Sequence, residues 1–244
     1  MDLTTVFLLT CVVFAIAMLY SSVGHAGASG YIAMMTLFGL APTIIKPAAL
    51  FLNIFVAVIA SWQFWRAGHF SWQLFWPFAI LSVPLAFVGG YIDLPTHVFK
   101  IIIGIVLLYS ALRFFVSPKA DEATQLPQIS VAIPIGAFLG LLSGLTGVGG
   151  GIFLTPLVIF MKWARTKTAA AVSALFILVN SLAGLLGNLA GTNKVPFLAF
   201  PMVCAAVAGG TIGSYMGSRR FSPMSVRRLL GVVLVIAGFK LLFA

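Results

Sequence analysis

The chain consists of long stretches that are apolar on every helical face, separated by short polar or proline-containing turns. Several stretches approach the roughly 20 residues that a helix needs to cross about 30 Å of hydrocarbon. Lipid cannot satisfy backbone N–H and C=O groups, so stretches of this kind must be helices or strands of a closed barrel. Barrel strands would alternate apolar and polar residues over about ten positions, and these stretches do not alternate. The pattern therefore predicts an all-α, polytopic helical membrane protein.

The apolar segments occur in the same order in each half of the chain, and the second segment of each half is short. The segments predicted in the first half are 3–22, 28–40 (short), 43–65, 72–92 and 97–115. Those predicted in the second half are 129–146, 151–162 (short), 168–190, 195–216 and 224–243. Helix-start signals support these limits, since Thr43 follows Pro42 and Ser222 precedes Pro223.

The segment 129–162 leaves the topology open. A helix of that length would measure about 51 Å, which is too long for one straight crossing. Two crossings would give five per half and an inverted repeat. One crossing plus a re-entrant piece would give four per half and a parallel repeat.

A hydrophilic linker, residues 117–128, separates an N-terminal transmembrane repeat, 1–116, from a C-terminal one, 129–244. Small and polar residues of the first half recur 123 positions later in the second. The pairs include Gly24 and Gly147, Gly27 and Gly150, Thr43 and Thr166, Ala48 and Ala171, and Gly68 and Gly191. The spacing lengthens only in loops and holds through the spans, which favours internal duplication over chance matching. Duplication is a common construction of secondary transporters.

Composition and charge place the chain in a membrane and orient it. Hydrophobic residues make up 61% and charged residues 7%, whereas soluble domains carry about 25% charged residues. Fourteen Lys and Arg residues against four acids give a net charge of +10, but no polar domain is present that could hold nucleic acid. Lys162, Arg165 and Lys167 share one short loop, which the positive-inside rule places in the cytoplasm. We expect a multi-pass protein of the cytoplasmic membrane, in contact with lipid.

Two glycine-rich segments carry the functional prediction. Residues 147–151 read Gly-Val-Gly-Gly-Gly, and the first-half counterpart, 24–27, reads Gly-His-Ala-Gly. Each helical Gly costs about 1 kcal/mol relative to Ala, so these clusters predict non-helical breaks at 23–30 and 146–151 that face each other near the bilayer centre. The N–H groups of the helix after a break, at its positive dipole end, form an anion site. Close packing through small residues is the alternative, and it accounts for the four-residue spacing of Gly209, Gly213 and Gly217.

The predicted substrate contacts combine the hinge glycines with nearby polar groups. They are Ser22, Gly24, His25, Gly27, Asn53, Thr146, Gly147, Gly149, Gly150 and Asn180.

The absence of certain residue types from the span interiors reduces the number of possible functions further. No carboxylate lies there, which argues against cation transport and favours an anion. Cys11 and Cys204 are interpreted as buried small hydrophobes, without a disulfide. The sequence shows no metal site, no cofactor motif and no catalytic acid–base pair, so we predict a transporter and not an enzyme. A cation or metal transporter, and a non-transporting membrane subunit or enzyme, remain the alternatives.

The chain resembles the TauE/SafE family of sulfite and organosulfonate exporters over nearly its whole length. The resemblance rests on the duplicated halves, on the glycine segment 147–151 followed by Phe-Leu-Thr-Pro at 153–156, and on Thr-Lys-Thr-Ala-Ala-Ala at 166–171. The first-half segment 24–28 departs from the repeat, with alanines where the second half has glycine. The resemblance implies export of sulfite or a small sulfonate, driven by a proton or ion gradient. The sequence leaves the particular substrate and the oligomeric state open.

Overall fold

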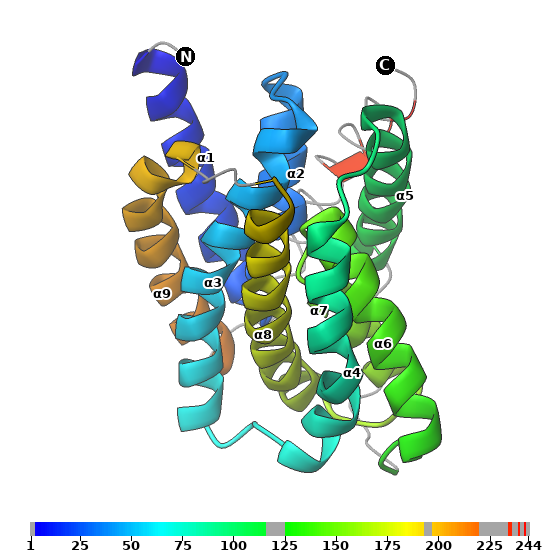
Figure 1. Ribbon diagram of the computed structural model, residues 1–244. Helices are drawn as coiled ribbons and strands as arrows, with labels where there is room; N and C mark the ends of the chain where they lie inside the picture. The colour runs from blue at the N-terminus through cyan, green and yellow to red at the C-terminus, as the bar shows by residue number, and fades with distance from the viewer. Residues whose placement is uncertain are drawn as a thin grey trace.

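The computed structural model describes residues 3–115, 125–192 and 197–219, together with positions 234, 235, 239 and 242. Helices account for nearly all of the described residues (Figure 1). They are α1 (Leu3–Ser21), α2 (Ala28–Leu37), α3 (Pro42–Arg66), α4 (Trp72–Tyr91), α5 (Thr96–Phe115), α6 (Ile129–Thr146), α7 (Gly151–Phe160), α8 (Thr166–Thr192), the 3-10 helix η1 (Phe197–Met202) and α9 (Val203–Arg219). Most of the predicted span 224–243, its start signal at Ser222, and residues 117–124 of the predicted linker lie outside the described residues.

Every described helix ends within three residues of its predicted bound, with η1 and α9 together forming the segment predicted at 195–216. Five segments are long and apolar enough to cross a membrane: α3, α4, α6, α8 and η1–α9. The two short helices, α2 and α7, have 10 residues each, about 15 Å, which is half of a hydrocarbon core. The all-α, multi-pass membrane prediction is therefore confirmed.

Backbone contacts at glycines fix the direction of the long helices. On α6, Gly136 and Gly140 lie in turn on the backbone of Phe78 and Ser82 of α4. On α8, Gly187 and Gly191 lie in turn on Phe87 and Tyr91 of α4, so α4, α6 and α8 run parallel. Gly209 and Gly217 of α9 lie on residues 14–18 and 22 of α1, so these two helices are also parallel to each other. Small residues let the backbones of such pairs approach closely, as predicted for the α9 glycines.

Helices at matching places in the two halves run in opposite directions. In Figure 1, α3 descends from the end near the chain termini while α8 ascends toward that end. The halves also interlock, because α4 packs on α6 and α9 packs on α1, while α3 and α8 lie together between these pairs. Opposite directions are those expected of an inverted repeat.

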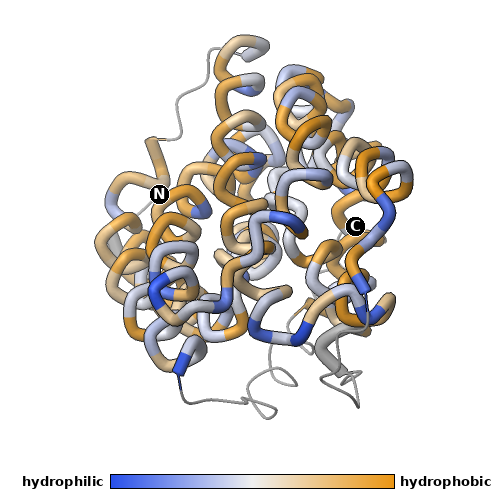
Figure 2. Tube along the Cα trace, turned by 90° about the horizontal axis from the view of Figure 1, so that it is seen from below, coloured by the Kyte–Doolittle hydropathy of each residue, from blue (hydrophilic) through white to orange (hydrophobic). Residues whose placement is uncertain are grey.

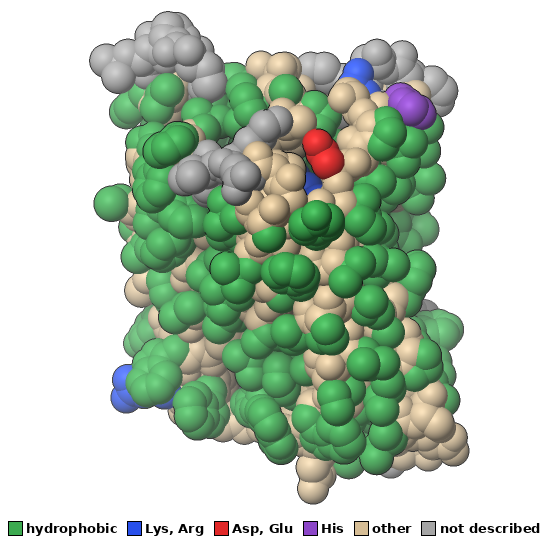
Figure 3. Space-filling model, viewed as in Figure 1, with side chains coloured by type: hydrophobic (Ala, Val, Ile, Leu, Met, Phe, Trp, Pro, Cys, Tyr) green, Lys and Arg blue, Asp and Glu red, His purple; other side chains and the backbone are tan. Residues whose placement is uncertain are grey.

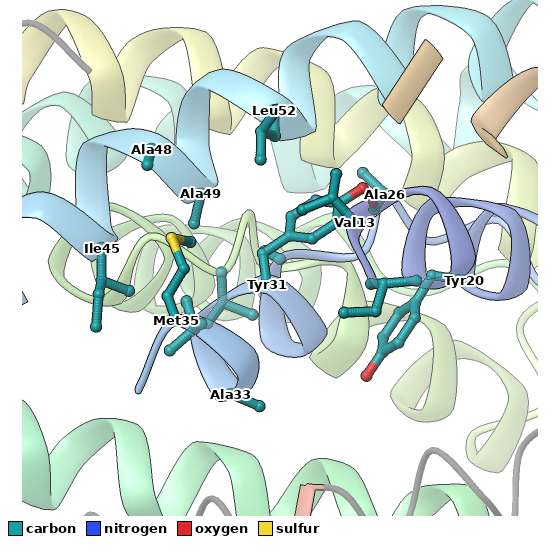
Figure 4. Packing of buried hydrophobic residues seen from close by; sticks show 14 of the residues in the cluster. Val13, Tyr20, Ala26, Tyr31, Ala33, Met35, Ile45, Ala48, Ala49 and Leu52 are labelled. Atoms are coloured by element: carbon teal, nitrogen blue, oxygen red, sulfur yellow. Dashed lines mark hydrogen bonds between the residues drawn. The ribbon is translucent and has the colours of Figure 1, made fainter. Parts of the chain in front are cut away.

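The short helices reverse the chain without crossing. In Figure 4, Tyr31 lies near Leu52 and Met35 near Ala49, so α2 runs antiparallel to α3. In the second half, Gly149 lies beside Ser181 and Gly151 beside Ser173, so α7 runs antiparallel to α8. The two topologies that the sequence left open are thus combined: a short returning helix occurs together with opposite helix directions.

The outer surface is that of a membrane protein with charge at its ends. Figure 3 shows hydrophobic side chains covering the flank, with an acidic and a basic group together near the upper end. Seen from below, hydrophilic positions lie mainly where the chain turns between helices (Figure 2). Cys11 and Cys204 are exposed on this apolar surface, so the prediction that they are buried was wrong. An apolar side chain in lipid needs no protein cover, so hydrophobicity alone could not distinguish the two environments.

Helix directions extend the charge argument to the first half. The end of α3 and the starts of α4 and α8 lie together, since Phe64, Phe70 and Ala170 share one hydrophobic cluster. Arg66 therefore joins the predicted cytoplasmic loop that carries Lys162 and Arg165. We therefore expect the opposite end, where α3 begins and α4 ends, to be the outer face.

Cysteine labelling in intact cells tests this orientation. With Cys11 and Cys204 replaced by alanine, Thr96→Cys at the outer end should react with a membrane-impermeant maleimide, because Thr96 is exposed at the start of α5. Gln73→Cys, exposed at the start of α4, should react only after the membrane is permeabilised. The reverse order of labelling would invert the assignment.

Two glycines of α8 provide a matched test of the helix packing. A Cβ at Gly187 would collide with the carbonyl of Phe87, whereas a Cβ at Gly184 would meet its neighbours at 3.4 Å or more. Alanine gains about 1 kcal/mol of helix propensity at either site. Gly187→Ala should nevertheless lower the unfolding temperature in detergent, since overpacking costs about 1–3 kcal/mol. Gly184→Ala should leave it equal or higher; equal shifts in both variants would contradict the packing.

Candidate binding site at the helix breaks

The first break comprises residues 22–27, between α1 and α2. Gly24 and Gly27 adopt φ angles of 78° and 105°, a left-handed region that favours glycine. The break is filled by protein, because the Tyr31 hydroxyl donates to the Ala26 carbonyl at 2.9 Å and the ring lies against Gly27 (Figure 4). The predicted range 23–30 was too long, since Ala28 to Gly30 already form the first turn of α2.

The second break comprises residues 147–150, between α6 and α7. Gly147, Gly149 and Gly150 have φ angles of 81°, 82° and 77°. A break at this position is confirmed, but it is shorter than the predicted 146–151, since Thr146 is the last residue of α6 and Gly151 the first of α7. That the two breaks face each other near the bilayer centre stays a prediction. Only glycine takes three left-handed positions in four residues without strain, which explains why the sequence has this composition.

Asn53, in the middle of α3, faces the second break. Its side chain is fully buried, and Nδ2 donates to the Val148 carbonyl and to the Ser181 hydroxyl, both at 3.4 Å. Gly149 lies directly beside this amide. Bonds of that length are weak, so the amide can exchange them for a ligand at small cost.

A second polar cluster joins the first break to α7. His25 lies 3.0 Å through Nε2 from the Thr155 hydroxyl, which donates to the Ser173 hydroxyl at 2.7 Å. His25 is 9% exposed and Ser173 is fully buried. The two breaks are thus connected by side chains, through one turn of α7.

One face of α8 links the two clusters. Ser173 and Ser181 are separated by eight residues, about 12 Å along the helix, with Ile177 between them under Gly149 and Gly151. The first N–H groups of α7 have no partner within their own helix and carry the positive end of its dipole. The region therefore offers hydroxyl, amide and backbone donors in a buried setting.

Some polar atoms on α3, α6 and α8 make no hydrogen bond in the described structure. These are Oδ1 of Asn53, Oδ1 of Asn180 and the hydroxyl of Ser143, all fully buried. Ser143 lies near Gly150. Buried polar atoms are nearly always paired, so their lack of partners indicates a place for a ligand or water.

Other predicted contacts lie apart from this region or are occupied. The Ser22 hydroxyl donates to the Leu19 carbonyl at 2.7 Å within α1. The Thr146 hydroxyl donates to Leu142 at 2.7 Å and accepts from the Val148 N–H at 3.4 Å, which closes the end of α6. Gly24 packs on Ala170, Gly147 on Lys46, and the amide of Asn180 donates to the Phe176 carbonyl at 2.8 Å.

Sequence reasoning missed four hydroxyl residues of the region: Ser143, Thr155, Ser173 and Ser181. A signal was present on α8, where the two serines and Asn180 recur at helical spacing within an apolar span. Thr155 gave no such signal, because its importance depends on contact with the distant His25. Among the described residues, no group of three His, Cys, Asp or Glu could hold a metal ion.

Comparison with known proteins agrees with this architecture. The family model described as sulfite exporter TauE/SafE matches residues 9–241. The "Probable membrane transporter protein y4hK" of Sinorhizobium fredii is 42% identical over 236 residues, covering 94% of this chain and 95% of that protein. YunE and YjnA of Bacillus subtilis, also named as membrane transporter proteins, are 25% and 24% identical over 68% and 90% of this chain and 68% and 92% of their own lengths. No solved structure shows a significant match.

The hydrogen bonds that join His25, Thr155 and Ser173 between the breaks can be tested by measuring the stability of variants. Thr155→Val keeps the shape but leaves His25 and Ser173 without their shared partner, so it should cost about 1–3 kcal/mol in unfolding free energy. Thr155→Ser should recover most of that loss. Thr10→Val is the control, because the Thr10 hydroxyl bonds only the Val6 carbonyl of its own helix. Thermal unfolding in detergent measures all three, and equal losses for the two valine variants would argue against the link.

Proposed function

The chain belongs to the sulfite exporter TauE/SafE family of membrane transporters, and from this premise we propose that it exports a small anion, sulfite or an organosulfonate, from the cytoplasm. The proposed site lies at the paired glycine-rich breaks and centres on the second. We expect the protein to act as a secondary transporter and not as an enzyme.

One observation carries the proposal. The second break opens the buried N-terminus of α7 beside Gly149, Gly150 and the Asn53 amide, and the Ser181 and Ser143 hydroxyls lie next to it. Backbone N–H groups at a helix N-terminus attract negative charge, and hydroxyl and amide donors add hydrogen bonds to oxyanion oxygens. No carboxylate is buried among the described residues to repel such an ion.

The helix directions supply a framework for transport. We propose that residues 1–116 and 129–244 are inverted repeats, as the opposite directions of α3 and α8 support. Sites at the interface of inverted repeats, next to discontinuous helices, allow one half to rock against the other. The asymmetry of the breaks, with Tyr31 filling the first, favours one anion site over two.

A cation transporter is the second candidate. Oδ1 of Asn53 and Oδ1 of Asn180 are buried acceptors without a partner, and acceptors suit a cation or a proton-bearing ligand. A side-chain amide can, however, turn to present its NH₂ group, so this observation does not exclude an anion. The missing buried carboxylates favour the anion.

Flux through the purified protein tests the proposal. Proteoliposomes containing only this chain should move radiolabelled sulfite down its gradient, and a small uncharged analogue should not compete. Sulfite movement equal to that of empty liposomes would refute the proposed substrate. Movement of a monovalent cation instead would select the second candidate.

Valine variants of two glycines, tested in the same flux assay, distinguish an effect on binding from an effect on folding. Gly150→Val and Gly39→Val both place a β-branched residue at a left-handed position, with φ angles of 77° and 76°, at a cost of about 1–2 kcal/mol. Gly39 has open space around it, whereas Gly150 lies among Phe176 and Ser143 beside the proposed site. Flux per folded molecule should fall below detection only in Gly150→Val. Equal flux in both variants would leave Gly150 a structural role only.

A further inference from the structure

A small polar pocket lies at the outer end, where α3 begins and α4 ends. Its volume is about 20 Å³, which is room for one water, and its polar lining comprises Thr43, Lys46, Asp93, Thr96, Asn188 and Thr192. The pocket is separate from the Asn53 cluster but touches the second break, because the backbone and side-chain stem of Lys46 lie against Gly147.

Lys46 is held by the end of α4. Its side chain is 5% exposed, and Nζ donates to the carbonyls of Gly89, Gly90 and Ile92 at 3.2, 3.0 and 3.0 Å. An ammonium group has three donors, so each proton has one carbonyl. These carbonyls belong to the last turn of α4 and to its C-cap residue Ile92, where the helix dipole is negative and favours a cation.

Hydrogen-bond acceptors in and around the pocket determine the charge of the ligand that it can hold. Its lining includes Asp93, which carries a carboxylate, and Asn188, whose Oδ1 is buried without a partner. The three carbonyls that hold Lys46 Nζ lie beside this lining. Such a set repels an anion, so the pocket is no outer binding place for sulfite. It suits a proton or a cation, and the ammonium group of Lys46, at the end of a flexible side chain, supplies that cation.

We propose that Lys46 carries a proton through which the pH on the outer side controls anion export, and that its protonated form latches the start of α3 to the end of α4. This inference rests on the proposed transport function. When a proton leaves, the N–H bond breaks, its electron pair stays on Nζ, and the proton passes to the exposed Asp93 carboxylate and then to outer water. The neutral amine keeps two protons for three carbonyls, so the latch loosens.

The contact with Gly147 transmits this change to the anion site. Because the second break packs on Lys46 itself, a shift at the start of α3 reaches Gly147 directly and Gly149 two residues on. Asp93, on the α4–α5 connection, is the titratable group that lines the pocket with Lys46; the polar lining residues of α3, α5 and α8 are neutral.

Substitutions that fix the charge at position 46 separate the control of flux by pH from transport itself. An arginine keeps its charge across the accessible pH range, whereas a methionine has none. In sulfite-loaded proteoliposomes, a gradient of one pH unit should change wild-type flux by up to about tenfold, the ratio of proton activities. Lys46→Met should retain downhill flux without that response, and Lys46→Arg should stay latched, with flux near background. A Lys46→Met protein that responds like the wild type would overturn the proposal.

Lys167 is the matched control. Lys167 is the second residue of α8, and Lys46 is the fifth residue of α3. The Nζ of Lys167 donates to the Ser218 carbonyl at the end of α9 at 3.3 Å, but the side chain is exposed. Lys167→Met should therefore keep the full pH response. Loss of the pH response in both lysine variants would mean that the response does not reside at Lys46.

Thiol labelling without substrate tests the proposed role of Lys46 independently of the transported ion. Pro47 is buried and lines the pocket, so Pro47→Cys in a protein lacking Cys11 and Cys204 reports opening. Its modification by a water-soluble thiol reagent should rise with pH more steeply with Lys46 present than with Lys46→Arg, whose rate corrects for thiol ionisation. Parallel rates would refute the latch even if sulfite proved the wrong substrate. Absent wild-type sulfite flux with divergent rates would refute the proposed function alone.

Discussion

The structure depends on one constraint: backbone N–H and C=O groups cannot remain unpaired in hydrocarbon. The chain leaves helical geometry twice within its apolar segments, at 22–27 and 147–150. Both breaks are consequently enclosed by protein, one by the Tyr31 hydroxyl and ring and the other by α3 and α8. The helices that enclose the second break also carry Asn53 and Ser181. The same two helices, α3 and α8, therefore bury the break and supply the polar side chains of the site.

Close backbone packing makes this enclosure possible. Glycines at four-residue spacing on α6 and α9 lie on carbonyls of α4 and α1. Helices in lipid gain little from burying apolar side chains, so association relies on such close contacts. Each contact joins one half of the chain to the other, and the second break is covered in part by α3 of the first half.

Two lysines near helix starts, Lys46 and Lys167, make the same kind of contact in different environments. Lys167 and Lys46 each reach the last carbonyls of a neighbouring helix, at opposite faces of the protein. Exposed to solvent, Lys167 closes a helix end, while the buried Lys46 has three carbonyl acceptors and direct contact with Gly147. Its environment gives Lys46 a role that its residue type and position in the sequence do not distinguish.

The sequence by itself determined the membrane class, the helix bounds and the position of both breaks, because hydrophobic length and clustered glycines act locally. It placed Asn53 and Gly149 among the candidate contacts without showing that they meet. Only the tertiary structure decided the helix directions, the lipid-facing position of Cys11, and the joining of His25 to Thr155 across 130 residues. These depend on which helices interlock, and apolar residues facing lipid and apolar residues facing protein have the same composition.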